Sequence, residues 1–277
     1  MYKFIINVLI LLGLSNTYAY DKKDIVIFKT GTSCNKCDLR YMVSINKEAP
    51  GGDFRGAYMF NVNLTKSNFN GSNFQSANLI QSELSYVDFT DANLSKANLR
   101  MANLTGATLR DANVTQASLR ETTLNFADVS HADLGTSDMR DMTFNNGYAT
   151  DATFSSCNMS NSSFLSTDFN RSHFMGAKIE NANFSGSNLS NTNLYQATII
   201  TSNLSGANLS FANLAGVDFK GSNLTKANFN GANITDVDFT DADLTDAQLD
   251  TALFVNVTTC RTKSSKPIKN SKEQCKL

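Results

Sequence analysis

The 277-residue sequence contains no tryptophan, only two prolines and only two histidines, and its formal net charge is −1. A charge so close to zero gives no overall attraction to nucleic acid or to an anionic membrane. No glycine-rich phosphate loop occurs, and no serine or cysteine can be matched to a histidine and an orienting acid as a nucleophile would require. The histidines, His131 and His173, are far apart in the chain. The sequence therefore predicts that the protein is not an enzyme and has no catalytic residue, no metal site and no cofactor.

The first twenty residues have the features of a secretory signal peptide. Lys3 provides a positive start, residues 4–14 form an apolar run of 11 residues, and Thr17-Tyr18-Ala19 is a small-x-small cleavage site. Eleven apolar residues are too few to cross a bilayer as a helix. We expect residues 1–19 to be removed, which would leave a secreted or periplasmic protein without a stable membrane anchor. An uncleaved amphipathic or membrane-anchoring segment is the alternative.

The rest of the chain is dominated by a period of five. From Phe54 to Phe254 every fifth residue is apolar or alanine, at 41 positions in one phase, of which 18 are Leu and 14 are Phe. We call this residue the centre of its unit. The residue two before the centre is Ala at 21 of the 41 positions, with Met142 as the only large exception, and the residue directly before it is Asn or Asp at 27. A period of five fits neither a helix nor a flat strand, so it predicts a solenoid that turns a corner every five residues.

Units such as Ala-Asn-Leu-Ser-Lys at 92–96 and Ala-Asn-Leu-Arg-Met at 97–101 resemble the pentapeptide-repeat family over residues 52–254. The resemblance implies an all-β fold, a right-handed quadrilateral parallel β-helix. Four five-residue sides would close a coil of 20 residues, and about ten coils would form a rod on the order of 48 Å long. Positions 20 apart should then stack, so Leu84, Leu104 and Leu124 should form an inward ladder.

Both ends of the array are expected to be capped. We divide the chain into a signal peptide at 1–19, an N-terminal cap at 20–51, the β-helix at 52–254 and a C-terminal cysteine-containing tail at 255–277. Residues 24–29 are predicted to form a strand over the first coil. Residues 41–51, with Pro50, are predicted to form a loop or irregular turn, because a proline inside the repeats would lack a ladder donor. The pattern is weakest at 146–149, where we expect a local bend or a widened coil.

The five cysteines divide by position. Cys157 occupies a small inward site and is expected to be a buried, inert thiol. Cys34 and Cys37 lie at one end of the predicted rod, and Cys260 and Cys275 lie at the other. A disulfide needs Cα atoms within about 7 Å, so Cys34–Cys37 and Cys260–Cys275 are the expected pairs unless a tail folds back along the rod. A redox role for Cys34-x-x-Cys37 and a zinc site that joins the four cysteines are the alternatives.

Charge is distributed unevenly. Residues 52–254 hold 20 Asp and Glu against 11 Lys and Arg, whereas both ends are basic. Arg100, Arg120 and Arg140 are spaced by 20 and should stack on one edge. One stretch near the end of the array carries six carboxylates, which form either a solvated surface that keeps the rod soluble or a docking patch for a basic partner: Asp236, Asp238, Asp241, Asp243, Asp246 and Asp250.

These features favour a non-catalytic exported module with a structural or protein-binding role. Its partner and oligomeric state stay open, and no nucleic-acid partner is expected. The alternative is the best-known activity of the resembling family, the inhibition of DNA gyrase or topoisomerase by an acidic rod that mimics DNA. The signal peptide, the lack of projecting loops and the basic cysteine-containing tail count against this alternative.

Overall fold

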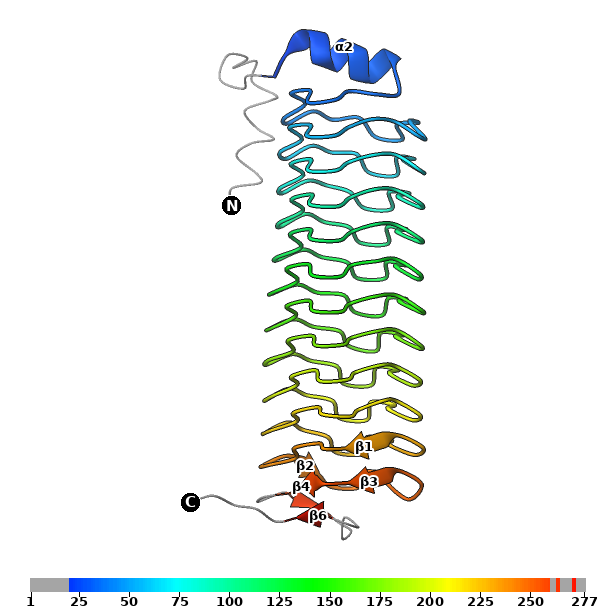
Figure 1. The fold of residues 1–277 in the computed structure, drawn as a ribbon. Coiled ribbons are helices and arrows are strands. Elements are labelled where there is room, and N and C mark those ends of the chain that lie inside the picture. The colour runs from blue at the N-terminus through cyan, green and yellow to red at the C-terminus, as the bar shows by residue number, and fades with distance from the viewer. Residues whose placement is uncertain (1–19, 260–262, 265–270, 273–277) are drawn as a thin grey trace.

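The computed structural model describes residues 20–259, 263–264 and 271–272, and it shows a straight stack of coils with a helix across one end (Figure 1). The predicted signal peptide at 1–19 lies outside the described residues. Helix α2 spans Lys22–Thr30, and six short strands lie near the C-terminal end. The strands pair in parallel as β1–β3, β2–β5 and β4–β6. Their bounds are β1 Asn233–Thr235, β2 Asp243–Leu244, β3 Leu253–Val255, β4 Val257–Thr258, β5 Lys263–Ser264 and β6 Ser271–Lys272.

The remaining coils are joined by isolated parallel bridges between residues 20 positions apart. The series runs from Asp38↔Tyr58 to Asp238↔Thr258 with one bridge every five residues. Strands β1 and β3 keep the same spacing, with Asn233 opposite Leu253. The coil length is therefore the 20 residues that the sequence predicts, and each coil contains four five-residue units.

A hydrogen-bonded turn closes most units. In the unit centred on Leu64, the N–H of Ser67 donates to the carbonyl oxygen of Leu64 at 3.1 Å. Lys66, two residues after the centre, has a φ of 58°, and the other described residues with positive φ occupy the same place in their units. This conformation is costly for most residues. It is tolerated because the turn and the ladder bonds on both sides fix the backbone.

The Asn or Asp before each centre has a structural role in this turn. The residue directly after the centre points its N–H away from the ladder and needs another acceptor. In the Leu64 unit, Asn63 Oδ1 accepts the Thr65 N–H at 3.0 Å and the Thr65 hydroxyl at 2.7 Å. Asn188, Asn208 and Asn228 also bond to one another from coil to coil through their side-chain amides. The preference for Asn at this position therefore follows from the turn and the stacking together.

The core is filled by the centres and the small residues two positions before them. Each centre from Phe54 to Leu244 is at most 1% exposed. Aromatic centres 20 residues apart stack, with ring centroids 4.5 Å apart for Phe164 and Phe184. Where the small residue is polar, its hydroxyl is satisfied, as when Ser82 Oγ donates to the Met59 carbonyl at 2.9 Å.

The N-terminal cap differs from the prediction, because residues 24–29 lie in helix α2 and not in a strand. The Asp21 side chain accepts the Lys23 N–H at 2.8 Å, and the Gly31 N–H bonds to the Ile27 carbonyl at the other end. Phe28 is buried, and its ring meets that of Phe54 in the coil below at 5.8 Å. The β-branched residues favour a strand locally, but the helix places an apolar side over the open core.

The predicted loop at 41–51 was also wrong, since this segment is already part of the ladder. Val43 pairs with Asn63, and Glu48 pairs with Asn68. Pro50 stands directly after the centre Ala49, at the position whose N–H never enters the ladder, so its missing donor costs nothing there. Gly51 follows with a φ of 66° and completes the turn. Proline is thus compatible with the array at this one position of a unit.

The bend expected at 146–149 is not observed. Tyr148 pairs in register with both Asp128 and Asp168, so the ladder continues without a break. The ring of Phe144 fills the space that a side chain at Gly147 would need: a Cβ there would lie 2.0 Å from Phe144 Cε2. The large centre thus compensates for the glycine, and the coil keeps its register.

Candidate interaction surfaces

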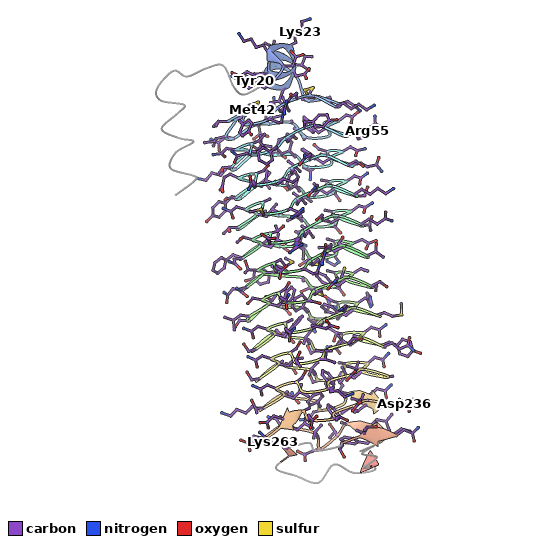
Figure 2. All side chains as sticks on the ribbon, turned by 90° about the vertical axis from the view of Figure 1, so that its left-hand side faces the viewer. Tyr20, Lys23, Met42, Arg55, Asp236 and Lys263 are labelled. Atoms are coloured by element: carbon purple, nitrogen blue, oxygen red, sulfur yellow. A yellow bond between two sulfur atoms is a disulfide. The ribbon has the colours of Figure 1, made fainter. Side chains whose placement is uncertain are left out.

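The 20-residue register sorts the outward side chains into four longitudinal rows. Each unit exposes the residue before its centre, the residue after it and the corner residue two after it. We name the rows after the centres of one coil, Phe54, Met59, Leu64 and Phe69, and each row continues in steps of 20. In Figure 2 these side chains project from the whole length of the rod, so the rows are the surfaces available for binding.

The Met59 row contains the stacked arginines, and most of their charge is paired. Arg140 bonds to Asp138 at 2.6 Å, and Arg120 lies 3.2 Å from Asp141 and 3.5 Å from Glu121. The Arg140 hydrogen bond holds the pKa of Asp138 below its usual range. Such exposed pairs contribute little to stability, but they leave two of the three predicted arginines engaged by carboxylates. The row therefore does not form a simple anion site.

Both histidines are exposed and lie near one carboxylate of the Phe69 row. Arg171 donates to Asp151 through two nitrogens, at 2.8 and 2.6 Å. These hydrogen bonds lower the pKa of Asp151, and the charges of His131 and His173 act in the same direction. Over the part of the chain that the structure describes, no group of three metal-ligating side chains converges.

The six predicted acidic residues encircle the C-terminal end of the rod and do not form one column. Asp236, Asp241 and Asp246 are exposed corner residues of successive units. Two other members support their own turns: Asp238 Oδ1 accepts the Thr240 N–H at 2.8 Å, and Asp243 Oδ1 accepts that of Thr245 at 3.0 Å. The structure thus brings the six residues into one belt around the rod end. Two of their carboxylates are engaged by backbone N–H groups of their own turns.

The basic tail supplies a positive neighbour for this belt. Strand β5 pairs with β2 so that Lys263 stands opposite Asp243. The pKa of Asp243 is lowered mainly by the Thr245 hydroxyl and N–H, and also by the charge of Lys263. One lysine of the chain's own C-terminal segment therefore already acts on a carboxylate of the belt.

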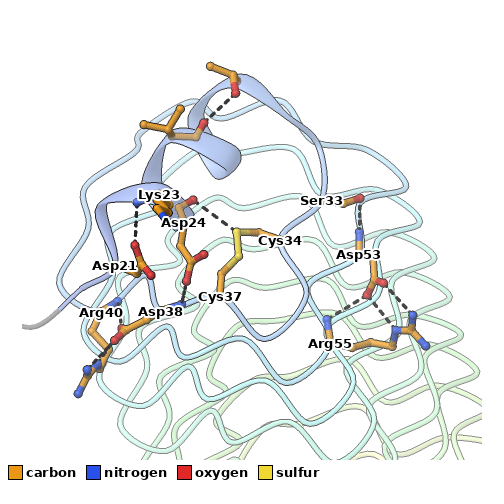
Figure 3. The surroundings of a disulfide bond; sticks show 12 residues. Asp21, Lys23, Asp24, Ser33, Cys34, Cys37, Asp38, Arg40, Asp53 and Arg55 are labelled. Atoms are coloured by element: carbon orange, nitrogen blue, oxygen red, sulfur yellow. Dashed lines mark hydrogen bonds and ion pairs between the residues drawn. A yellow bond between two sulfur atoms is a disulfide. The ribbon is translucent and has the colours of Figure 1, made fainter.

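The structure joins Cys34 and Cys37 by a disulfide, as the sequence predicts, with their Cα atoms 5.3 Å apart. Figure 3 shows this bond beneath helix α2, where Cys34 Sγ lies 3.5 Å from the Asp24 carbonyl oxygen. The Asp24 carboxylate accepts the Asp38 N–H at 2.8 Å. Both cysteines are buried, so the bond ties the helix connection to the first coil. The other predicted pair, Cys260 and Cys275, lies outside the described residues.

Cys157 is buried in the position that serine occupies elsewhere. Its thiol donates to the Leu134 carbonyl at 3.0 Å, and burial raises its pKa to about 12. Because the thiolate is the reactive form, we expect iodoacetamide to leave Cys157 unlabelled until the protein unfolds. Non-reducing peptide mapping should also show Cys34 linked to Cys37 and Cys260 linked to Cys275. Rapid labelling of native Cys157, or a cross-link between the two rod ends, would contradict the placement of the cysteines.

The sequence analysis missed a set of exposed aromatic side chains. Tyr86 and Phe126 stand at corners of the Leu64 row, and each is 61% exposed. Phe211, at a corner of the Phe69 row, is 68% exposed. Their signal was present in the sequence, since each is an aromatic residue two positions after a centre, where polar residues and glycine predominate. Exposed apolar groups that gather along one edge indicate a contact surface.

Within the described residues, no helix has both the length and the apolar character required to cross a membrane. Helix α2 has only nine residues and carries Lys22, Lys23, Asp24 and Lys29. Its place at the end of the rod is that of a cap.

Comparison with known proteins identifies the repeat. A family model described as pentapeptide repeats, with eight copies, matches residues 49–75, 72–111, 102–141, 150–186, 172–200 and 202–241. A search of curated protein sequences gives no match.

Solved structures of repeat proteins are also similar to this chain. HetL of the cyanobacterium Nostoc sp. strain PCC 7120, a pentapeptide repeat protein involved in heterocyst differentiation regulation, is 27% identical over 85% of this chain and 97% of its own, with a TM-score of 0.35. A trypsin-treated form of QnrB1, a plasmid-mediated fluoroquinolone resistance protein, is 19% identical over 82% of this chain and 91% of its own, with a TM-score of 0.45. Rfr23 of the cyanobacterium Cyanothece 51142 is 15% identical over 76% of this chain and 96% of its own, with a TM-score of 0.14.

Proposed function

This chain belongs to the pentapeptide-repeat family, and we propose on that premise that it is an exported, non-catalytic module with a structural or binding role. Family membership gives it the family's right-handed β-helix. The four-sided cross-section and the number of about ten coils, counted at 20 residues each, are part of the proposal. Its outward rows are the surfaces that meet a partner.

One observation supports the binding role above others, namely the unbroken register of the ladder. Bridges between residues 20 apart continue from Asp38 to Thr258. Outward side chains are therefore held in straight rows on a rigid backbone, which lowers the entropy cost of binding along the rod. A surface of this kind recognises extended partners without any chemical step.

Export is supported by the N-terminal sequence and by the cysteines. Lys3, the apolar run at 4–14 and Ala19 form a cleavable signal. The Cys34–Cys37 disulfide fits an oxidising compartment such as the periplasm or the extracellular space. Export also separates the protein from cytoplasmic gyrase, which places the DNA-mimic alternative second.

A gyrase supercoiling assay distinguishes the two functions. We expect the purified protein to inhibit supercoiling weakly or not at all, because the acidic belt surrounds one rod end and does not run along the rod as DNA phosphates do. The test variant changes Asp236, Asp241 and Asp246 to Asn, a residue that accepts their positive φ.

The matched control changes Asp91 and Asp111 to Asn, since these are corner carboxylates of another region with the same backbone conformation. Strong inhibition by the unmodified protein that only the belt variant abolishes would favour the DNA mimic over the exported module. If the belt instead docks a basic protein, the triple variant should bind that protein more weakly and with a flatter salt dependence.

A further inference from the structure

The Leu64 row differs from its neighbours in having no charge over a long stretch. Over the six units centred from Leu104 to Leu204, none of its outward residues is Asp, Glu, Lys, Arg or His. The flanking rows carry charge over the same coils, with Arg120, Asp138 and Arg140 on one side and Asp128 and Asp168 on the other. A neutral strip thus runs along the rod between two charged rows.

The strip presents polar groups in fixed positions. Thr105 Oγ1 donates to Asn103 Oδ1 at 2.7 Å, and two units of the row further on Asn145 Oδ1 accepts Ser163 Oγ at 2.7 Å. Ser185 Oγ bonds to Asn183 Oδ1 at 2.8 Å in the same way. A hydroxyl that donates its proton to asparagine keeps its oxygen as an acceptor for a ligand. Every unit of the strip therefore presents at least one hydroxyl or amide group, with the coils about 4.8 Å apart, and the exposed Leu165 is its one large aliphatic side chain.

Two aromatic rings of the same row stand at one end of this strip, Phe126 within it and Tyr86 one coil before its first unit. Tyr86 and Phe126 are corner residues of the Leu64 row, 40 positions apart, so two coils or about 9.6 Å separate them along the rod. The coil between them has Gly106 at its corner, and a Cβ there would lie 2.6 Å from Tyr86 Cε1. The glycine lets the Tyr86 ring lie against the backbone with its other side open to solvent.

From this arrangement we infer that the Leu64 row binds an extended, uncharged polysaccharide of the β-1,4-linked type along the rod axis. Two pyranose units of such a chain span about the same length as two coils, so alternate sugar rings meet Tyr86 and Phe126. Aromatic faces pack on the C–H surface of a pyranose, and the hydroxyl and amide array bonds to its hydroxyl groups. The strip itself holds no ionised side chain that a neutral ligand would have to desolvate, and the one carboxylate of the Tyr86 unit, that of Glu83, already accepts a hydrogen bond from the Asn103 side-chain amide at 3.0 Å. The inference rests on the proposed function, since it assigns a ligand class to one outward row.

The test uses the purified protein, two soluble polymers and one oligosaccharide. Hydroxyethylcellulose and carboxymethylcellulose share a backbone and differ in charge, and affinity electrophoresis in each shows which slows the protein. We expect retardation by the neutral polymer and less by the anionic one, which Asp128 and Asp168 of the flanking row repel. Titration calorimetry with cellohexaose then gives the affinity of each variant.

Changing both Tyr86 and Phe126 to Asn removes the rings without adding charge, and Asn accepts the positive φ of both sites. We expect the affinity for cellohexaose to fall roughly tenfold with an unchanged melting temperature. Phe211→Asn is the matched control, because Phe211 also packs over a glycine of the next coil, Gly231, but belongs to the charged Phe69 row.

No retardation by hydroxyethylcellulose, or an equal loss of affinity in Phe211→Asn, would overturn the inference. So would capture of a protein partner by the Leu64 row in place of the oligosaccharide. These outcomes leave the proposed function standing, because export and the belt variant are measured independently of glycan binding.

Discussion

Leu104→Asp is expected to destabilise the protein by more than about 4 kcal/mol. Leu104 is fully buried, and it lies one coil from Leu84 on one side and from Leu124 on the other. Its own N–H is committed to the Thr123 carbonyl at 2.7 Å, so the backbone cannot move to expose a carboxylate. An aspartate there would be desolvated without a partner. Thermal and urea unfolding followed by circular dichroism measure the loss.

Thr105→Asp is the matched control, because it changes the next residue of the same unit. Thr105 points outward, and its hydroxyl bonds only to Asn103. We expect a cost of about 1 kcal/mol or less. Equal destabilisation by the two substitutions would refute the assignment of inward and outward positions, and with it the phase of the repeat.

Gly147→Ala is the second substitution with a large expected effect. It should destabilise the protein, although it introduces the consensus residue of the repeat. Alanine is the commonest residue two before a centre, and a repeat average would predict stabilisation. In this unit a Cβ would lie 2.0 Å from Phe144 Cε2 and 2.9 Å from the Ala127 carbonyl oxygen. Overpacking of this kind costs about 1–3 kcal/mol. The free energy of unfolding should fall accordingly.

Two further variants identify the cause. Phe144→Leu replaces the ring that occupies the site by a smaller side chain. The double variant should therefore lose less stability than the sum of the losses in the two single variants. Gly71→Ala tests backbone strain alone, because nothing lies within 4 Å of its Cβ while its φ is 64°. A Gly147→Ala protein more stable than its parent would show that the ring does not fill the site.

The inward half of the fold could be predicted from sequence because the core repeats in one phase with few exceptions. Almost every unit places one large and one small residue inside, and the exceptions at Met142 and Ala149 leave the period and phase visible over 41 units. The structure of the turn was harder to predict from the sequence. The preference for Asn before the centre was visible as a frequency, but its cause, the acceptor for the next N–H, needed the geometry of residues such as Asn63 and Thr65.

The ends were predicted less well because they do not repeat. Residues 24–29 contain Ile25, Val26 and Ile27, which favour a strand by propensity, whereas contact of Phe28 with the first coil selects a helix. Pro50 suggested an interruption, but only one position per unit tolerates proline, and Pro50 occupies it. Among the candidate surfaces, the acidic belt was predicted from charge. The aromatic edge was not predicted, because Tyr86 and Phe126 stand at corner positions outside the periodic series of centres.

The proposal that this repeat protein acts outside the cytoplasm is tested most directly by sequencing the N-terminus of the native protein after cell fractionation. Cleavage after Ala19 predicts a chain that begins at Tyr20 and is recovered from the periplasm or the medium. Recovery of an intact Met1 terminus from the soluble cytoplasm would contradict the exported module and favour the DNA-mimic alternative.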